Sequence, residues 1–280
     1  MRNKPLCLIT MGDPAGIGPE VILRTLASAR AADIADIAVV GWPEPFERDA
    51  AMLGMTVAIN PMDDPSTIAP RPGVMNLVVP EGVYDAPSAY GAVEARCGKA
   101  AARCIERSAE LLMEGRADAV VTAPINKEAL SLAGYRYPGH TEFYRNLTGA
   151  GDIAMMLSLG NFRVVHVTTH TAIRDVPALV TKDRIIRVAL LLADALDLTG
   201  IARPRIAVSG LNPHAGEAGM FGREEIDEIA PAVAELAARG IDISGPHPPD
   251  TVFARAYGGE FDAVVAMYHD QGHVALKLAG

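Results

Sequence analysis

Short runs of β-forming apolar residues alternate with helical patterns along the whole 280-residue chain. Such alternation is typical of βα units, in which parallel strands are joined by crossover helices. Strands are expected at 6–10, 37–41, 74–79, 119–122, 153–159, 163–167, 205–209 and 263–267. Helices are expected at 19–29, 90–114, 127–133, 141–147, 182–198, 224–239 and 251–256. The Pro-rich stretch from Pro61 to Pro80 is expected to be an irregular surface connection. The pattern therefore predicts an α/β protein with a largely parallel sheet.

The composition fits this class, because hydrophobic residues make up 50% of the chain and aromatic residues only 5%. A core of mainly aliphatic side chains suits helices packed on buried strands. The formal net charge of −9 leaves no basic excess to neutralise phosphates, which argues against nucleic acid or an anionic membrane as a partner. The longest apolar run, at 188–198, contains Asp194 and Asp197 and is too short for a membrane helix.

The three cysteines, Cys7, Cys97 and Cys104, cannot all pair within one chain. Cys97 and Cys104 both lie on the expected helix 90–114, about 10 Å apart along its axis, which is too far for an undistorted disulfide. The sequence therefore predicts free thiols and a reducing, cytoplasmic setting.

Three of the seven histidines follow expected strands directly: His170, His214 and His269. Loops at strand ends are where α/β folds bind ligands, and three imidazoles leave open positions on a divalent ion. The alternative is three unrelated loop histidines, because their spacing matches no local metal motif. His247 and His273 are expected to be bystanders, and His166 is not expected to pair with His170 as on a helix.

A glycine-rich segment joins the first expected strand to the first expected helix and contains Gly12, Gly16 and Gly18. Glycines there let the backbone approach a ligand closely, and a helix N-terminus favours an anion, which indicates a cofactor-binding loop. The segment is neither a Walker loop nor a Gly-x-Gly-x-x-Gly fingerprint. A plain tight turn is the alternative.

Several other polar residues stand at expected strand ends or helix starts. His140 and Thr141 offer an imidazole and a hydroxyl to a phosphate, although Thr141 as a simple N-cap is the alternative. Lys127 follows a buried strand, and Lys277 lies near residue 280; each is either a contact for an anionic substrate or a solvated side chain. Asp250 either caps the following helix, or it orients a substrate hydroxyl or acts as a base.

Five motifs occur in an order and at a spacing that resemble one enzyme family. They are 11–20 (MGDPAGIGPE), 122–128 (TAPINKE), 138–142 (PGHTE), 212–217 (NPHAGE) and 268–272 (YHDQG). Together they resemble the 4-hydroxythreonine-4-phosphate dehydrogenase family of vitamin B6 synthesis, over essentially the whole chain. The resemblance implies an isocitrate-dehydrogenase-like α/β/α sandwich with two domains flanking an active-site cleft. The expected domains are 1–125 plus about 265–280, and 126–264.

The resemblance also implies roles for individual residues. The family's metal-ligand histidines fall on His170, His214 and His269, with one divalent ion (zinc, cobalt or magnesium) at each site. Its substrate-phosphate contacts fall on His140 and Thr141, and its later lysine falls on Lys277. A homodimer with shared active sites is implied as well. Family members continue with an asparagine, an arginine and a helical segment, so residues 1–280 are expected to be a truncated form of a longer enzyme.

The activity implied by the resemblance is the metal- and NAD-dependent oxidation, with decarboxylation, of a 4-phosphorylated 3-hydroxy acid. The substrate is expected to be 4-phosphohydroxy-L-threonine, of pyridoxal phosphate biosynthesis, or 4-phospho-D-threonate or 4-phospho-D-erythronate. His273 and the segment 248–253 favour the second branch. Asp250 and Lys127 are the candidate groups for proton transfer. The rival hypotheses are a metal-dependent hydrolase and an acyl-phosphate transferase on a similar fold.

Overall fold

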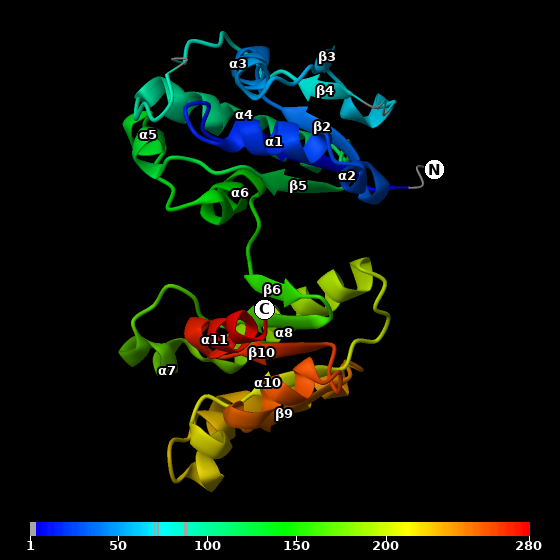
Figure 1. Cartoon of the computed structure of the whole chain (residues 1–280). Coiled ribbons are helices and arrows are strands. Elements are labelled where there is room, and N and C mark those ends of the chain that lie inside the picture. The colour runs from blue at the N-terminus through cyan, green and yellow to red at the C-terminus, as the bar shows by residue number, and fades with distance from the viewer. Residues whose placement is uncertain (1–3, 70, 72, 87–88) are drawn as a thin grey trace. The chain divides into compact units, whose positions relative to one another are not determined.

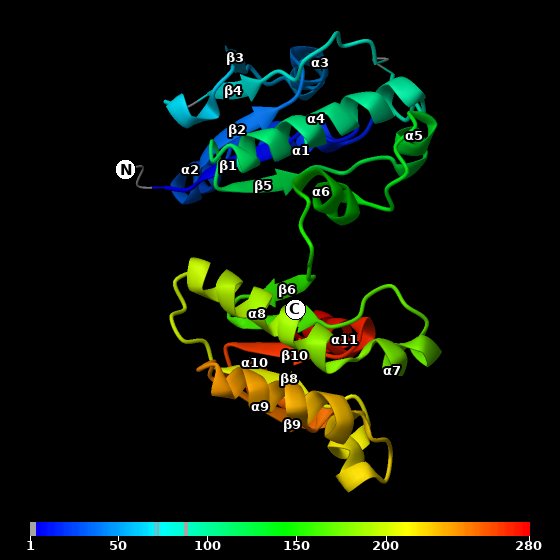
Figure 2. The same cartoon turned by 180° about the vertical axis from the view of Figure 1, so that it is seen from behind.

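The computed structural model describes residues 4–69, 71, 73–86 and 89–280. The chain divides into two compact units, Met1–Ala150 and Gly151–Gly280, each built on its own sheet (Figures 1 and 2). This alternation of strands and helices confirms the expected α/β class.

In the first unit, the described residues form a five-stranded parallel sheet of order β3-β4-β2-β1-β5. Its strands are β1 (Leu6–Thr10), β2 (Asp36–Val40), β3 (Ala58–Met62), β4 (Val74–Val78) and β5 (Ala119–Thr122). Its helices are α1 (Gly18–Leu26), α2 (Ala29–Ile34), α3 (Pro43–Leu53), α4 (Ala95–Met113), α5 (Lys127–Leu132) and α6 (His140–Thr148), with a 3₁₀ turn η1 at Pro65–Thr67.

The order of the strands explains why helices cover both faces of this sheet. Strand order runs outward from β1 and then reverses to β5, and right-handed crossovers on opposite sides of β1 place their helices on opposite faces. Helix α1 accordingly lies on one face and α4 on the other (Figures 1 and 2). Both faces of the central strands are therefore buried, and Leu6, Leu8, Val39 and Leu77 are inaccessible to solvent.

In the second unit, the described residues form a sheet of order β6-β7-β10-β8-β9, in which only β6 runs antiparallel to its neighbour. Its strands are β6 (Met156–Leu159), β7 (Phe162–His166), β8 (Ile206–Ser209), β9 (Ile243–His247) and β10 (Ala263–Ala266). Its helices are α7 (Val176–Leu179), α8 (Lys182–Leu198), α9 (Ala230–Ala238), α10 (Pro249–Tyr257) and α11 (His269–Ala279), with 3₁₀ turns η2 (Ile173–Asp175) and η3 (Pro213–Gly219) and a π-helical turn η4 (Glu225–Ile229).

Alternate residues of these strands belong to two different apolar cores. Val265 of β10 belongs to a core shared with helices α8 and α9, whereas Val264 belongs to a core shared with α10 and α11. Successive side chains of a strand point to opposite faces of the sheet, so each face has its own layer of helices. Both faces of the sheet are therefore covered by helices.

Two edge strands were not expected from the sequence. Strand β3 contains Pro61 and strand β9 contains Gly245 and Pro246, residues that argue against a strand. Both strands lie at sheet edges, where a missing N–H does not interrupt pairing on two sides. The expected irregular connection from Pro61 to Pro80 is wrong at Pro61 and Met62, which end β3. Strand β4 is the strand expected at 74–79, and the described residues between β3 and β4 contain only the short turn η1; residues 70 and 72 lie outside the described residues.

Helices α2, α3, α7 and α11 were also not expected. Helix α3 begins with Pro43 and ends at Gly54, whose φ of 63° is left-handed, so both helix-boundary signals were present. Helix α11 begins at His269, so the 268–272 motif lies at its start.

The unit boundary differs from the expected domain division of 1–125 plus 265–280 and 126–264. Helices α5 and α6 pack on α4 of the first unit, with Leu130 and Phe143 against Ile105. Helix α11 packs on β6, β7 and α10 of the second unit, where Leu276 lies in the core. Contacts therefore divide the chain at Ala150 and Gly151.

The cysteines are free thiols, as expected. Cys97 and Cys104 are buried on α4, and Cys7, Cys97 and Cys104 are free thiols. No helix in the described part of the chain is long and apolar enough to cross a membrane.

Gly98 provides a test of how closely α4 and α5 pack. A Cβ at this position would lie 2.0 Å from the carbonyl oxygen of Ala129 in α5. Although alanine is the better helix former, we expect Gly98→Ala to lower the free energy of unfolding by about 2 kcal/mol or more, because backbone must move. Lys99→Ala, at the exposed neighbouring position, should change it by less than about 0.5 kcal/mol. Urea unfolding measures both variants. A Gly98→Ala variant as stable as the native protein would contradict the close packing of α4 and α5.

Candidate active site

The carboxyl end of the second sheet gathers the histidines that follow its strands. Strand β10 pairs in parallel with β7 and β8, so the three strands end at one edge of the sheet. The segments that leave this edge carry His170 after β7, His269 after β10 and His214 after β8. Gln271 joins two of these segments, because its Oε1 accepts from the N–H of Met267 and its Nε2 donates to the Gly210 carbonyl, at 2.7 and 2.8 Å.

His170 and His269 line one cavity at this edge. Their ring centroids are 5.6 Å apart. The cavity has a volume of about 380 Å³, and its other lining residues are Thr168, Thr169, Thr171, Ile173, Val176, Tyr268 and Asp270. Imidazole, hydroxyl and carboxylate groups therefore face a space large enough for a small polar substrate.

Two further histidines, which the sequence analysis did not select, lie directly behind His269. His273 stacks on His269 with ring centroids 3.7 Å apart, and the His166 ring lies 4.8 Å from that of His273. The four-residue spacing of His269 and His273 was a detectable signal, but it depended on α11 beginning at His269. The expectation that His273 is a bystander is therefore not supported by its contacts.

The hydrogen bonds of His166 determine which nitrogens carry protons. His166 is inaccessible to solvent, and burial, with a smaller contribution from the neighbouring imidazoles, lowers its pKa to about 4. Its Nδ1 lies 3.2 Å from the carbonyl oxygen of Met155, which only accepts, so Nδ1 carries the proton. Nδ1 of His273 lies 3.3 Å from this unprotonated Nε2 and 3.1 Å from the carbonyl oxygen of His269, so Nδ1 of His273 is the donor to both. This arrangement leaves Nε2 of a neutral His273 without a proton.

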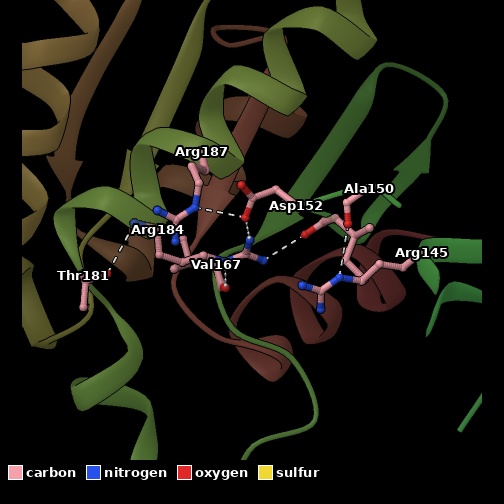
Figure 3. Close-up of polar contacts among 8 residues, drawn as sticks. Arg145, Ala150, Asp152, Val167, Thr181, Arg184 and Arg187 are labelled. Carbon is pink, nitrogen blue, oxygen red and sulfur yellow. Dashed lines mark hydrogen bonds and ion pairs between the residues drawn. The ribbon is translucent and has the colours of Figure 1, made fainter. Parts of the chain in front are cut away.

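Arg184 on α8 holds the strand that leads to His170. Its guanidinium donates to the carbonyl oxygens of Val167 at 3.1 Å and Ile153 at 3.0 Å. Arg184 and Arg187 both approach the carboxylate of Asp152, at 3.3 and 3.0 Å (Figure 3). The end of β7 is thereby fixed to the segment that precedes β6.

His214 is exposed, in a loop of unusual backbone conformation. Its Nδ1 lies 3.9 Å from the Asp250 carboxylate at the start of α10. The expected alternative for Asp250, a helix cap, is not seen, because α10 has no side-chain cap in the described structure. Asp250 instead extends the candidate site to a fourth strand, since α10 directly follows β9.

The expected metal ligands do not form a complete metal site in this chain. Among the described residues, no group of three or more His, Cys, Asp or Glu is arranged to hold a metal ion. His170 and His269 approach each other, whereas His214 has Asp250 as its neighbour. The three-histidine ligand set stays a prediction.

In the first unit, two of the three glycines of the expected cofactor loop are required by the fold itself. Gly12 has a φ of 74°, and a Cβ there would lie 2.4 Å from the carbonyl oxygen of Pro124. A Cβ on Gly18 would lie 2.3 Å from the carbonyl oxygen of Met11, whereas Gly16 has only ordinary contacts. Backbone packing explains Gly12 and Gly18 without a ligand, and cofactor binding stays a prediction for all three.

The expected phosphate contacts open helix α6. His140 is its first residue, and Nε2 of His140 is buried without a hydrogen-bond partner among the described residues. Burial lowers the pKa of this imidazole. Thr141 is exposed, and the N-cap is Gly139, so the alternative of a Thr141 cap is wrong.

The two candidate lysines are both exposed. Lys127 begins α5, whose cap is the Asn126 side chain, accepting from the N–H of Ala129 at 3.0 Å. Lys277 lies in the last turn of α11. The expected role of each lysine stays a prediction.

A family model, two curated relatives and a crystal structure all relate this chain to the same enzyme family. Residues 33–280 match the family described as "Pyridoxal phosphate biosynthetic protein PdxA". The chain is 46% identical over 275 residues to a D-threonate 4-phosphate dehydrogenase of Pectobacterium atrosepticum, covering 97% of this chain and 83% of that protein. It is 44% identical over 277 residues to a 4-hydroxythreonine-4-phosphate dehydrogenase of Geobacter metallireducens, covering 99% and 82%. A crystal structure of a 4-hydroxythreonine-4-phosphate dehydrogenase from Burkholderia phymatum superposes with a TM-score of 0.92 at 42% identity, covering 100% and 84%.

The lowered pKa of His166 predicts a pH dependence of stability. An unfolded histidine titrates near 6.5 and His166 near 4, so between these values the unfolded chain binds the extra proton. The contribution is fully present above pH 6.5 and falls by about 3 kcal/mol as the pH drops to 4. Urea unfolding of His166→Gln should show a pH dependence weaker by that amount over this range. If the free energy of unfolding changed with pH equally in the variant and the native protein, a neutral, buried His166 would be contradicted.

Proposed function

Because the chain belongs to the PdxA family, we propose that it oxidises a 4-phosphorylated 3-hydroxy acid with NAD, followed by decarboxylation. The observation that carries this proposal is the alignment of named dehydrogenases over almost the whole chain. The same alignment makes the chain an oxidoreductase. The rival classes, a hydrolase and an acyl-phosphate transferase, are therefore set aside.

The proposed reaction has two chemical steps. Oxidation of the secondary alcohol transfers a hydride from carbon and a proton from the hydroxyl oxygen. NAD would supply the hydride acceptor. The resulting 3-oxo acid then loses carbon dioxide, and the electrons of the broken carbon–carbon bond pass to the ketone oxygen as an enolate. The protein must therefore bind the phosphate, accept a proton and stabilise negative charge on one oxygen atom.

Residues at the carboxyl edge of the second sheet are suited to accept the proton and to stabilise the negative charge on oxygen. We assign His170 and His269 to contacts with the substrate oxygens, because both line the same cavity. Asp250 is the proposed proton acceptor, because its carboxylate is exposed beside His214 at this edge. Lys127 is the second candidate group for proton transfer.

A divalent ion on His170, His214 and His269 remains part of the proposal only through the family resemblance. When bound, such an ion would polarise the substrate oxygen as a Lewis acid. Zinc, cobalt and magnesium are the candidates. The described residues do not form the complete ligand set, so the roles above are assigned to side chains alone. The homodimer with shared active sites and the contact from Lys277 are proposals of the same origin.

His140 and Thr141 are the proposed phosphate contacts. Nε2 of His140 is buried without a hydrogen-bond partner in the described structure, which is costly unless a ligand or water pairs with it. The helix that His140 opens also presents unpaired N–H groups and the positive end of its dipole. Both features favour an anion at this position.

Between the two substrate branches we favour D-threonate 4-phosphate. The relative from Pectobacterium, named for that substrate, is 46% identical, and His273 packs behind the candidate site. We expect NADH absorbance on mixing the protein with NAD and a divalent salt, with kcat/KM at least tenfold higher for D-threonate 4-phosphate than for 4-phosphohydroxy-L-threonine. The opposite ranking would assign the chain to the vitamin B6 branch. No NADH with either substrate would overturn the proposed reaction.

The phosphate assignment predicts a selective effect of His140→Ala. Loss of one hydrogen bond to a charged group costs about 1.5–3 kcal/mol, so KM for the phosphorylated substrate should rise roughly 10- to 100-fold. The dephosphorylated analogue lacks the contact, and its kcat/KM should change less than about threefold. Steady-state kinetics with both compounds make the comparison. Equal losses for the two would show that His140 does not bind phosphate.

A further inference from the structure

The backbone of the His214 loop adopts a left-handed conformation over five consecutive residues. The φ angles from His214 to Ala218 are 52°, 56°, 82°, 43° and 54°. Only Gly216 among them is a glycine, and the other four carry a Cβ that disfavours this conformation. Such a run persists only where surrounding contacts hold it. The loop therefore needs an anchor, and that anchor need not lie within the motif itself.

Glu225 provides this anchor from the π-helical turn η4. It is only 3% exposed, although it carries an ionisable side chain. One carboxylate oxygen accepts from the backbone N–H of Leu211 at 2.8 Å and of Asn212 at 2.7 Å. The other accepts from Nδ2 of Asn212 at 2.9 Å. All three donors belong to the two residues that leave β8 on the way to His214.

The loop is also shaped to fit around this carboxylate. A Cβ on Gly216 would lie 2.7 Å from Oε2 of Glu225, and a Cβ on Gly210 would lie 3.2 Å from Oε1. The backbone therefore wraps closely around Glu225 on both sides of His214. A π-helical turn, which often occurs at functional sites, begins at Glu225 itself.

We propose that Glu225 is a positioning residue for His214: its buried carboxylate orders the loop and thereby directs the imidazole toward the reacting atoms. The proposal rests on the proposed function, in which His214 belongs to the active site. Glu225 acts through the loop and has no contact with substrate in this proposal. Glu225 orders the loop through its hydrogen bonds with the loop residues and not through a long-range effect of its charge.

Glu225→Gln tests the proposal, because glutamine keeps the volume of the side chain and replaces one accepting oxygen by a donor. We expect the amides of Leu211 and Asn212 to exchange with deuterium at least tenfold faster. We also expect kcat to fall at least tenfold while KM for the phosphorylated substrate changes less than threefold. Glu225→Leu, which removes all three acceptor contacts, should enlarge both effects. All assays are made on the full chain, at least 15 °C below the measured Tm of each variant.

Asp227→Asn is the matched control, on the same turn. The Asp227 carboxylate pairs with Arg223 at the surface and, among the described residues, has no hydrogen bond with the loop. This variant should leave amide exchange at Leu211 and Asn212 within twofold of the native protein, and kcat unchanged. A general effect of altering η4 would instead appear in both variants and would overturn a specific role for Glu225.

Two outcomes for Glu225→Gln would overturn the proposal. Unchanged amide exchange would show that the carboxylate does not order the loop. Faster exchange with normal kcat would show that loop order does not position His214 for the reaction. His214→Ala, assayed in parallel, tests the site assignment: full activity there would contradict the proposed function, while amide exchange would still decide whether Glu225 orders the loop.

Discussion

The parallel pairing of β10 with β7 and β8 is the constraint on which the candidate site depends. These three strands are far apart in the sequence, yet their carboxyl ends meet at one edge because parallel strands share a direction. The residues that follow them, His170, His214 and His269, are brought to that edge by the sheet and not by any local motif. Strand β9 adds Asp250 to the same edge.

Near this edge, buried polar groups fix the positions of neighbouring groups through hydrogen bonds, which apolar side chains cannot do. His166 is held neutral by burial and fixes the proton position on His273, which stacks on His269. Glu225 accepts three hydrogen bonds from the loop before His214. A buried polar group is costly unless its partners are in place, so each such residue also fixes the geometry of those partners. His269 and His214 thus depend on neighbouring groups that do not line the cavity.

The first unit shows a contrasting use of residues. Gly12 and Gly18 permit close backbone approaches to Pro124 and Met11, which makes their presence a requirement of folding. His140, in contrast, has a buried nitrogen without a protein partner in the described residues, and folding alone does not explain it. Unsatisfied groups are therefore better indicators of a ligand here than glycines are.

The sequence by itself determined the α/β class, most strands with buried faces, and the position of His170, His214 and His269 after strands. These features are local, because aliphatic runs such as Leu6–Thr10 and the helical pattern at Lys182–Leu198 depend on nearby residues. The edge strands β3 and β9 were missed because their proline and glycine are tolerated only where one side of the strand is unpaired. Tertiary structure alone decided three features. They are the unit to which α11 belongs, the stacking of His273 on His269, and the hydrogen bonds of Glu225 with the His214 loop. Each of these depends on contacts between segments that only the pairing of distant strands brings together.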